Sequence, residues 1–332
     1  MSAALHLVTS VSPERADSLR PECFDDYIGQ PEVIANLRQS VRASKRGAWQ
    51  LDHVLLAGPA GIGKTSCAQV IANELGARCH VTSAPAIEHK GTLASLLTTL
   101  ANGDVLFIDE IHALGRALAE PLYSALEDRA IDLPAGKRVI RVPLCNFTLV
   151  GATTHAGKLP KPLRDRFGIV CQLRTYTTEE LAAIVVRSAS KLGVAIDDDG
   201  ATVIAQASRG TPRIANRLLR RVRDAAVNTM GDGAQLVCGE RSINGSLAAV
   251  ALAHLGIDQL GLDQLDRRYL ALVAERPLGI EAICAQLGED RSTVEDAIEP
   301  WLLCANLITR ERNGRVATAA GLRHCRQHAA TP

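Results

Sequence analysis

The segment that most constrains this 332-residue chain reads HVLLAGPAGIGKTS and spans residues 53–66. Its apolar first half ends at a Gly-Pro pair, which is typical of a short, fully covered strand in a parallel sheet. Gly58, Gly61 and Gly63 then allow successive backbone N–H groups to surround an anion. A helix predicted over 65–75 would direct its positive end to the same point. The spacing fits G-x-x-x-x-G-K-[ST], so the sequence predicts a phosphate-binding loop on an α/β sheet in preference to a plain glycine-rich turn.

Three residues at the end of this loop supply the chemistry that a nucleotide needs. Lys64 would reach the β- and γ-phosphates, and the Thr65 hydroxyl would take one position on Mg²⁺. Ser66 would hold an α-phosphate oxygen. The motif therefore predicts a bound nucleotide together with Mg²⁺.

A second segment, DVLFIDEIH at residues 104–112, sets four apolar residues before two acids. At the carboxyl end of a strand, Asp109 would orient Mg²⁺, and Glu110 would position or deprotonate the water that attacks the γ-phosphorus. Capping of a helix is the other use of such an acid pair. A further apolar run ends in VGATTH at residues 150–155, where one of two threonine hydroxyls would contact the water or the γ-phosphate. Together these motifs favour hydrolysis over binding alone.

Two arginines are candidates for neutralising charge during phosphoryl transfer. Arg166 lies in KPLRDRFG, and from a short helix it would reach the nucleotide of a neighbouring subunit, an effect of about 10³ to 10⁵ in rate. A surface ion pair with Asp165 is the alternative. Arg213 lies near the start of a helix predicted over 212–229 and would reach the γ-phosphate from a helical lid. A solvated basic face is the other interpretation of that helix.

Strand and helix patterns alternate through the first half of the chain, which predicts a doubly wound parallel sheet. Alternating residues between Ile131 and Val142 flank Ala-Gly, so we expect a hairpin inserted into this layout. The expected strands lie at 53–57, 79–82, 105–108 and 147–151, and the expected helices at 31–46, 65–75, 91–100 and 118–126.

Beyond residue 177 the strand patterns fade, and the rest of the chain predicts a small all-helical lid followed by a winged helix. The sequence HCRQH at 324–328 is interpreted as a frayed tail and not as a metal site. The expected lid helices are 178–191, 198–207 and 212–229; those of the winged helix are 263–275, 279–287 and 291–303, before strands at 307–312 and 314–318. The predicted domains are a flexible arm (1–18), an ATPase domain (19–176), the lid (177–254) and the winged helix (255–332).

Composition limits the classes of partner. Aromatic residues make up only 3% of the chain, which argues against base-stacking platforms as the main way of holding nucleic acid. The net charge is +1, but the sequence is locally basic from Arg310 onward. No apolar stretch reaches the 18 or so residues of a membrane span, so we expect a cytoplasmic protein with no membrane partner.

Seven segments in this order closely resemble the RuvB family, the AAA+ motor of Holliday-junction branch migration. The resemblance covers residues 19–318. It is most specific in the segment GTPRIANRLLRRVRD and in the winged helix that follows it. It implies a homohexameric ring that ATP hydrolysis drives along duplex DNA in recombination and repair, with RuvA and RuvC as partners. The segments are RPECFDDYIGQ, GPAGIGKTS, DVLFIDEIH, GATTHAG, LRDRFG, RGTPRIANRLLRRVRD and GLDQLDRRYL.

The resemblance also implies roles for individual residues. Lys64, Asp109, Glu110, Thr154 (first sensor), Arg166 (arginine finger) and Arg213 (second sensor) would be catalytic, with Thr65 and Asp109 at Mg²⁺. Arg310 and Arg315 in the wing would contact DNA, which agrees with the reach of arginines beside a hairpin turn. The implied nucleotide contacts are Leu19, Arg20, Tyr27, Ile28, Gly61, Gly63, Lys64, Thr65, Ser66, Asp128, Arg166, Tyr176 and Arg213.

The sequence departs from the family pattern at a few places, which indicates a divergent paralogue. Ala60 replaces a second proline, Ser66 a more common threonine, and Arg129 an aromatic residue. The winged helix is trimmed near 275–277. The hairpin is shorter and has a polar tip, Pro-Ala-Gly-Lys at 134–137; in the family this hairpin docks on RuvA, so the tip bears directly on that partnership.

Two other functions fit the same motifs. One is a RuvB-like AAA+ remodeller with a different partner. The other is a winged-helix regulator that binds DNA under nucleotide control and hardly hydrolyses ATP. Glu110 and Arg166 distinguish the ATPases from the regulator. A protein that only switches with bound nucleotide has no use for a water-polarising acid or for an arginine that acts on a neighbouring subunit.

Overall fold

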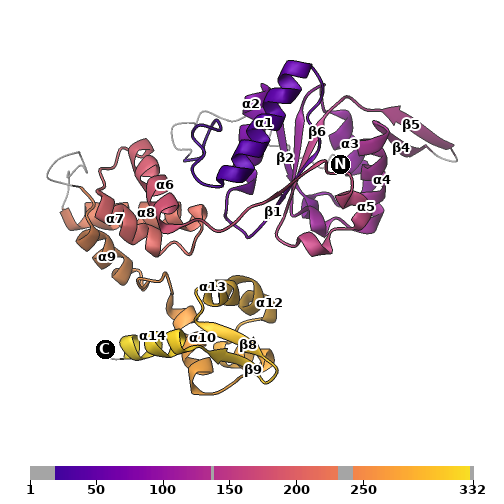
Figure 1. Cartoon of the computed structure of the whole chain (residues 1–332). Helices are drawn as coiled ribbons and strands as arrows, with labels where there is room; N and C mark the ends of the chain where they lie inside the picture. Colours follow the sequence, from indigo (N-terminus) through magenta and orange to yellow (C-terminus); the bar gives the residue numbers. More distant parts are fainter. Residues whose placement is uncertain (1–18, 136–137, 231–241, 330–332) are drawn as a thin grey trace. The chain divides into compact units, whose positions relative to one another are not determined.

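The computed structural model describes residues 19–135, 138–230 and 242–329 (Figure 1). The chain divides into two compact units. One comprises residues 1–192 with 210–216, and the other comprises 193–209 with 217–332. The predicted N-terminal arm, 1–18, lies outside the described residues. No helix in the described ranges is long and apolar enough to span a bilayer.

The first unit is built on a parallel five-stranded sheet with the order β2-β3-β6-β1-β7. This confirms the predicted α/β fold. The short edge strand β7 was not predicted, because among its four residues only Cys171 is fully buried and Val170 is 55% exposed, so it lacks a covered apolar run. The strands are β1 (Val54–Ala57), β2 (Cys79–Ser83), β3 (Val105–Asp109), β6 (Thr148–Thr153) and β7 (Ile169–Gln172).

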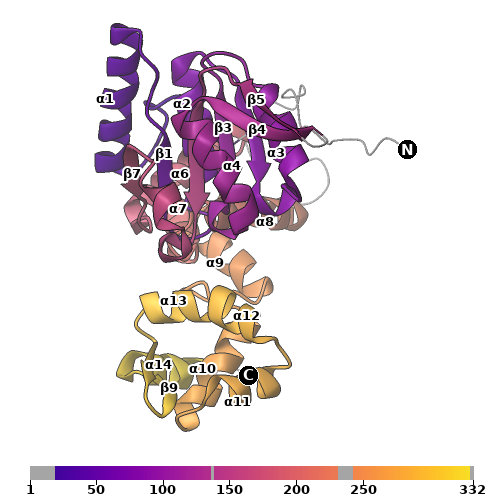
Figure 2. The ribbon, with the colours of Figure 1, turned by 90° about the vertical axis from the view of Figure 1, so that its right-hand side faces the viewer.

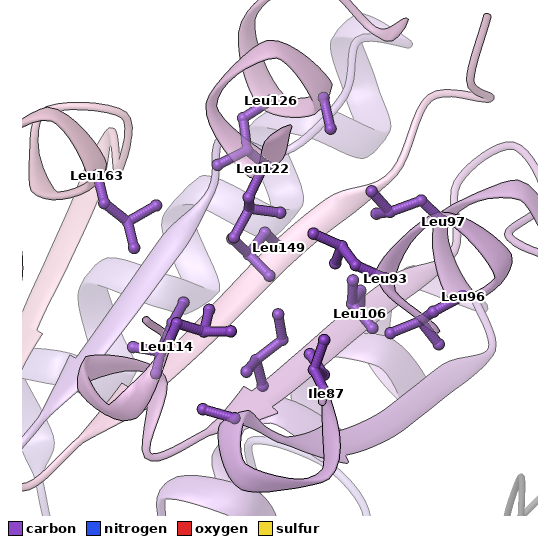
Figure 3. Close-up of a cluster of buried hydrophobic side chains, with 14 of the residues drawn as sticks. Ile87, Leu93, Leu96, Leu97, Leu106, Leu114, Leu122, Leu126, Leu149 and Leu163 are labelled. Carbon is purple, nitrogen blue, oxygen red and sulfur yellow. The ribbon is translucent and has the colours of Figure 1, made fainter. Parts of the chain in front are cut away.

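Helices cover both faces of this sheet, with α1 and α2 on one side and α3 and α4 on the other (Figure 1). Figure 3 shows leucines of α3 and α4 meeting those of the central strands β3 and β6. Leu97, Leu106 and Leu149 are fully buried in this cluster. Burial of such side chains stabilises the packing of the central strands, because each Å² of apolar surface removed from water contributes about 25 cal/mol to the free energy of folding. The helices are α1 (Pro31–Gly47), α2 (Lys64–Leu75), α3 (Lys90–Thr98), α4 (Arg116–Glu127), α5 (Lys161–Arg164) and α6 (Thr178–Lys191).

The predicted hairpin is present as β4 (Ala130–Ala135) and β5 (Arg138–Pro143), paired antiparallel from Ala130↔Pro143 to Ala135↔Arg138. It extends away from the sheet (Figure 1). Residues 136–137 of its tip lie outside the described residues. Arg129, at positive φ, donates from Nη1 to Gln50 Oε1 at 2.5 Å and to Asn146 Oδ1 at 3.2 Å. The residue that departs from the family pattern therefore anchors the base of the hairpin.

The expected lid helices are present as α6, α7 (Asp198–Gln206) and α8 (Pro212–Met230), followed by α9 (Gly245–His254). α6 begins with a capping box, in which Thr177 Oγ1 accepts from the Glu180 N–H and the Glu180 carboxylate accepts from the Thr177 N–H. α7 packs against α9 in the second unit.

The winged helix closes the second unit, where α14 and β9 lie beside α10 (Figure 2). The helix predicted over 291–303 contains a π-helical turn, because Pro300 has no N–H to donate to the carbonyl of Asp296 and its ring crowds that carbonyl. The elements are α10 (Gln264–Glu275), α11 (Ile280–Leu287), α12 (Arg291–Thr293), the π turn (Val294–Ile298), α13 (Glu299–Cys304), β8 (Ile308–Glu311), β9 (Gly314–Ala317) and α14 (Ala319–Ala329).

The interpretation of 324–328 as a frayed tail was wrong. These residues belong to α14, where His324 is buried and its Nε2 lies 2.9 Å from Asp258 Oδ2. The imidazole thus packs inside the domain and bonds to the Asp258 carboxylate. Among the described residues no cluster of His, Cys, Asp or Glu forms a candidate metal site.

Candidate functional site

The phosphate loop lies between β1 and α2, and its glycines take backbone conformations that other residues avoid. Gly61 and Gly63 have φ of 79° and 101°. A Cβ on Gly63 would lie 2.8 Å from the Tyr27 hydroxyl, so this position accepts only glycine without a shift of its neighbours. α2 begins at Lys64, which directs its unpaired N–H groups toward the loop.

In the part of the chain that the structure describes, the hydrogen-bond partners of the Lys64 ammonium are backbone carbonyls of this loop. Its Nζ donates to Gly58 O at 2.8 Å and to Pro59 O at 2.9 Å, and the residue is only 7% exposed. Burial lowers the pKa of Lys64, and the nearby Glu110 and Asp109 carboxylates oppose that shift. Carbonyl partners fix the ammonium without neutralising it, so a positive charge stands ready for an anion.

Two tyrosines close one side of the loop. Tyr27 Oη donates to Gly63 O and Tyr176 Oη donates to Ile62 O, both at 3.3 Å. Burial raises the pKa of each phenol. The structure therefore brings Tyr27 and Tyr176, two of the nucleotide contacts expected from sequence, to the backbone of the phosphate loop.

The segment that carries Leu19, Arg20 and Ile28 is tied down by α6. Leu19 is buried, and its carbonyl accepts from the Arg187 guanidinium at 3.3 Å. The Arg20 carbonyl accepts from Lys191 Nζ at 3.0 Å. The sequence analysis missed Arg187, because its partners are backbone carbonyls about 160 residues away and leave no local pattern.

The acid pair and the first-sensor threonine meet at the ends of neighbouring strands. Asp109 ends β3, and the adjacent β6 leads to Thr154. Thr154 Oγ1 donates to Glu110 Oε2 at 3.0 Å, and His112 Nδ1 lies 3.2 Å from the same oxygen. The sequence analysis did not single out His112 or His155, although both stand inside quoted motifs.

Arg213 lies directly over the phosphate loop, at the start of α8. Its N–H donates to Gly61 O at 3.3 Å, and a Cβ on Gly61 would stand 3.2 Å from the Arg213 Cβ. Five separate parts of the chain thus meet at the loop: the segments of Tyr27 and of Tyr176, the acid pair, the end of β6 and the start of α8.

Arg166 has different surroundings from the other site residues. It forms an ion pair with Glu127, its Nη1 donates to Pro162 O at 2.6 Å, and its guanidinium carbon lies 4.9 Å from the centroid of the Tyr123 ring. The ion pair expected as an alternative, with Asp165, is thus replaced by one with Glu127. Asp128, which the resemblance assigns to the nucleotide, instead pairs with Arg141 of β5 at 2.7 Å.

The wing arginines are engaged inside the winged helix. Arg310 Nε donates to Glu299 Oε2 at 2.9 Å, and Arg315 Nε donates to Glu299 Oε1 at 2.8 Å. Tyr269 Oη donates to Glu299 Oε1 at 2.8 Å, and Arg315 Nη2 reaches Glu295 at 3.1 Å. The Glu299 side chain is fully buried, while Arg315 is 14% exposed and Arg310 49% exposed. The two arginines expected at DNA therefore share one buried carboxylate.

Three family models match consecutive parts of the chain. The Holliday junction DNA helicase RuvB P-loop domain matches residues 19–173, the RuvB AAA lid domain 176–258, and the RuvB C-terminal winged helix domain 259–326. The chain belongs to the RuvB family. The resemblance inferred from the motifs is thereby confirmed.

Known proteins of the RuvB family align with almost the whole chain. A Holliday junction branch migration complex subunit RuvB of Paramagnetospirillum magneticum is 47% identical over 327 residues, covering 95% of this chain and 92% of that protein. The subunit of the same name from Kosmotoga olearia is 49% identical over 315 residues, covering 92% and 90%. The Thermotoga maritima RuvB Holliday junction branch migration motor superimposes with a TM-score of 0.81 at 43% identity, covering 93% of this chain and 98% of that chain.

Proposed function

We propose that this RuvB-family chain is an ATP-hydrolysing motor subunit that drives branch migration of Holliday junctions. The observation that carries the proposal is that Glu110, Thr154 and Arg213 come from three other parts of the chain to the phosphate loop that carries Lys64. Each of these groups has a use when a γ-phosphate is transferred to water, and a site for binding alone has no use for Glu110.

The roles within the site follow from the charges and donors. Lys64 and the N–H groups at the start of α2 bind the phosphates, and Ser66 supplies a further hydroxyl. Glu110 accepts a proton from the attacking water, and Thr154 and Arg213 orient the water and the γ-phosphate. Tyr27 and Tyr176, with Leu19, Arg20 and Ile28, hold the nucleoside side.

Thr65 and Asp109 would hold Mg²⁺. A hydroxyl and a carboxylate offer the hard oxygen donors that this ion prefers. The half-buried Asp109 carboxylate accepts one hydrogen bond, from the Glu110 N–H at 3.0 Å, which leaves lone pairs for the ion or its water shell. When bound, the ion neutralises charge that develops on the phosphate oxygens.

Arg166 is proposed to act on the ATP of a neighbouring copy in a hexameric ring, with Asp128 near the same interface. Arg166 follows α5 directly, and its guanidinium contacts Glu127 and Tyr123 of α4 and the Pro162 carbonyl of α5. A guanidinium presented from one subunit completes the site of the next, which makes turnover depend on assembly.

The winged helix and the hairpin are proposed as the contacts to DNA and to RuvA. Arg310 is half exposed on the wing, so its free edge is available to a phosphate. On β5, Val139 and Ile140 are 70% and 54% exposed, an apolar pair that suits protein docking in spite of the polar residues at the tip. RuvC would join through the junction itself.

ATP-dependent dissociation of a synthetic Holliday junction, with and without a RuvA protein, tests motor, substrate and partner together. We expect dissociation that requires ATP and is stimulated by RuvA. Absence of ATP hydrolysis even with duplex DNA present would favour a nucleotide-switched DNA-binding protein. Hydrolysis without junction dissociation would favour a remodeller with another partner.

A further inference from the structure

Two histidines and two threonines surround one oxygen of the Glu110 carboxylate. His112 Nδ1, which lies 3.2 Å from Glu110 Oε2, is also 2.9 Å from Thr153 Oγ1. On the other side His155 Nδ1 lies 2.9 Å from Thr154 Oγ1, whose hydroxyl reaches the same Oε2. The two imidazole rings stand 5.0 Å apart. One histidine therefore contacts Oε2 directly, and the other is linked to it through the Thr154 hydroxyl.

The proton positions follow from the number of donors. Thr154 has a single hydroxyl hydrogen, which an ionised Glu110 must receive because a carboxylate only accepts. The Thr154 oxygen then accepts from His155, so the His155 proton sits on Nδ1. The resulting chain of donors runs from His155 through Thr154 to Glu110.

The same reasoning assigns the proton of His112. The hydrogen bond of His112 Nδ1 is with Thr153 Oγ1 at 2.9 Å, and a bare lone pair on this nitrogen would be repelled by the Glu110 carboxylate 3.2 Å away, so His112 also carries its proton on Nδ1. Burial lowers the pKa of His112, the Glu110 carboxylate opposes this, and His155, Lys158 and Lys64 add to the lowering. His112 therefore donates from Nδ1 to Thr153 Oγ1 as a neutral imidazole, and it sets the positive end of this N–H beside the carboxylate, whose charge it leaves in place.

The second carboxylate oxygen has no such partners. Within the described ranges, both hydrogen bonds of the Glu110 side chain come from Thr154 and go to Oε2, and the close contact of His112 Nδ1 is with the same oxygen. Oε1 is left to accept from water. A carboxylate held by one oxygen presents the other in a fixed direction, which is the requirement for activating a single attacking water.

We infer that His112 and His155 are positioning residues for Glu110, which hold Oε2 against the end of β6 so that Oε1 meets the attacking water. The inference rests on the proposed ATPase function. Neither histidine touches the reacting atoms in this role: His112 acts directly on the carboxylate, and His155 acts through Thr154.

The test compares amide substitutions that differ in where they place an N–H. His112→Asn keeps a donor near the Nδ1 position, whereas His112→Gln moves it toward the Nε2 position and His112→Ala removes it. We expect Ala and Gln to lower kcat about tenfold to a hundredfold, as loss of a group that orients a functional ligand commonly does. Asn should recover most of the kcat, and the KM and the affinity for a fluorescent ATP analogue should change less than about twofold. His155→Ala should give a smaller loss of kcat.

A double-mutant cycle separates positioning from a purely structural role. In the Glu110→Gln background, His112→Ala should cause no further loss of turnover, because the carboxylate that it positions is gone. An equal loss in both backgrounds, a kcat that rises on removal of His112, or equal activities of Asn and Gln variants would each overturn the inference. Absence of ATP hydrolysis in the wild-type chain would instead overturn the proposed function.

Discussion

The phosphate loop and the wing both present cations that the sequence assigns to phosphates, yet the two regions hold them differently. Lys64 has only carbonyl partners, so its charge is fixed but not neutralised. Arg310 and Arg315 share the buried carboxylate of Glu299. The loop is therefore prepared for an anion, whereas much of the wing's positive charge stabilises the winged helix itself.

Arg166 stands between these cases. It is paired with Glu127 on its own chain, but the Glu127 side chain is 65% exposed, whereas that of Arg166 is 25% exposed. Exposed pairs contribute little, about 0–1 kcal/mol, and exchange partners readily. A buried carboxylate such as Glu299 cannot release its arginines at a comparable cost. The burial of the partner thus distinguishes a cation that can be transferred to another anion from one that cannot.

The largest expected effect follows from removing the unneutralised charge of the loop. Lys64→Ala should abolish ATP binding, because it removes the ammonium that the loop carbonyls hold in place for the phosphates. Binding of a fluorescent ATP analogue measures this. Glu110→Gln is the matched control, which should bind the analogue normally and keep only a small residual turnover. If Lys64→Ala bound the ATP analogue as tightly as the wild type, the loop would not depend on an unneutralised cation, and its difference from the wing would be lost.

Arg166→Ala should leave ATP binding nearly intact and reduce turnover by about 10³ to 10⁵. Mixing it with Lys64→Ala tests action between subunits: each variant is inactive alone, but an intact site on one chain meets an intact arginine on the other. We expect ATPase activity to return in the mixture. Mixtures as inactive as the separate variants, in confirmed mixed assemblies, would contradict an arginine that acts in trans.

Removal of Glu299 should damage the winged helix. Glu299→Ala leaves two arginines and the Tyr269 hydroxyl without their shared acceptor, and breaking a buried pair costs about 3–5 kcal/mol. In a Trp49→Phe background the fluorescence of Trp301 reports unfolding of this domain in the full chain. Glu311→Ala, at an exposed wing residue, is the control and should unfold as the parent does. Equal stability of the two variants would show that the network is not structural.

The smallest effect concerns the salt dependence of DNA binding. Arg310→Gln should weaken binding to all duplex sequences and reduce the slope of log K against log salt by about 1, as loss of one phosphate contact does. Arg315→Gln should change the slope less, because Arg315 is only 14% exposed and bonded to two acids. Identical slopes for wild type and Arg310→Gln would remove the wing's half-exposed arginine from the DNA contacts.

Local patterns predicted most of the fold. The glycine positions, the apolar runs before the acid pair and the helical periods depend on neighbours within a few residues, so the parallel sheet, the hairpin and the winged helix could be predicted. The edge strand β7 could not, because its burial depends on β1 alone beside it. The helical C-terminus was misinterpreted because His324 is stabilised by Asp258, 66 residues away.

The sequence by itself determined which chemical groups this protein carries and in what order, since motif spacing sets backbone geometry over short distances. Only the tertiary structure decided which of the cations are neutralised by a neighbouring acid. Lys64 contacts carbonyls, Arg166 pairs with an exposed acid, and Arg315 pairs with a buried one. It also placed His112 and His155 around Glu110. The physical reason is that the partners of a charged side chain, and the burial that sets their strength, come from segments that folding alone brings together.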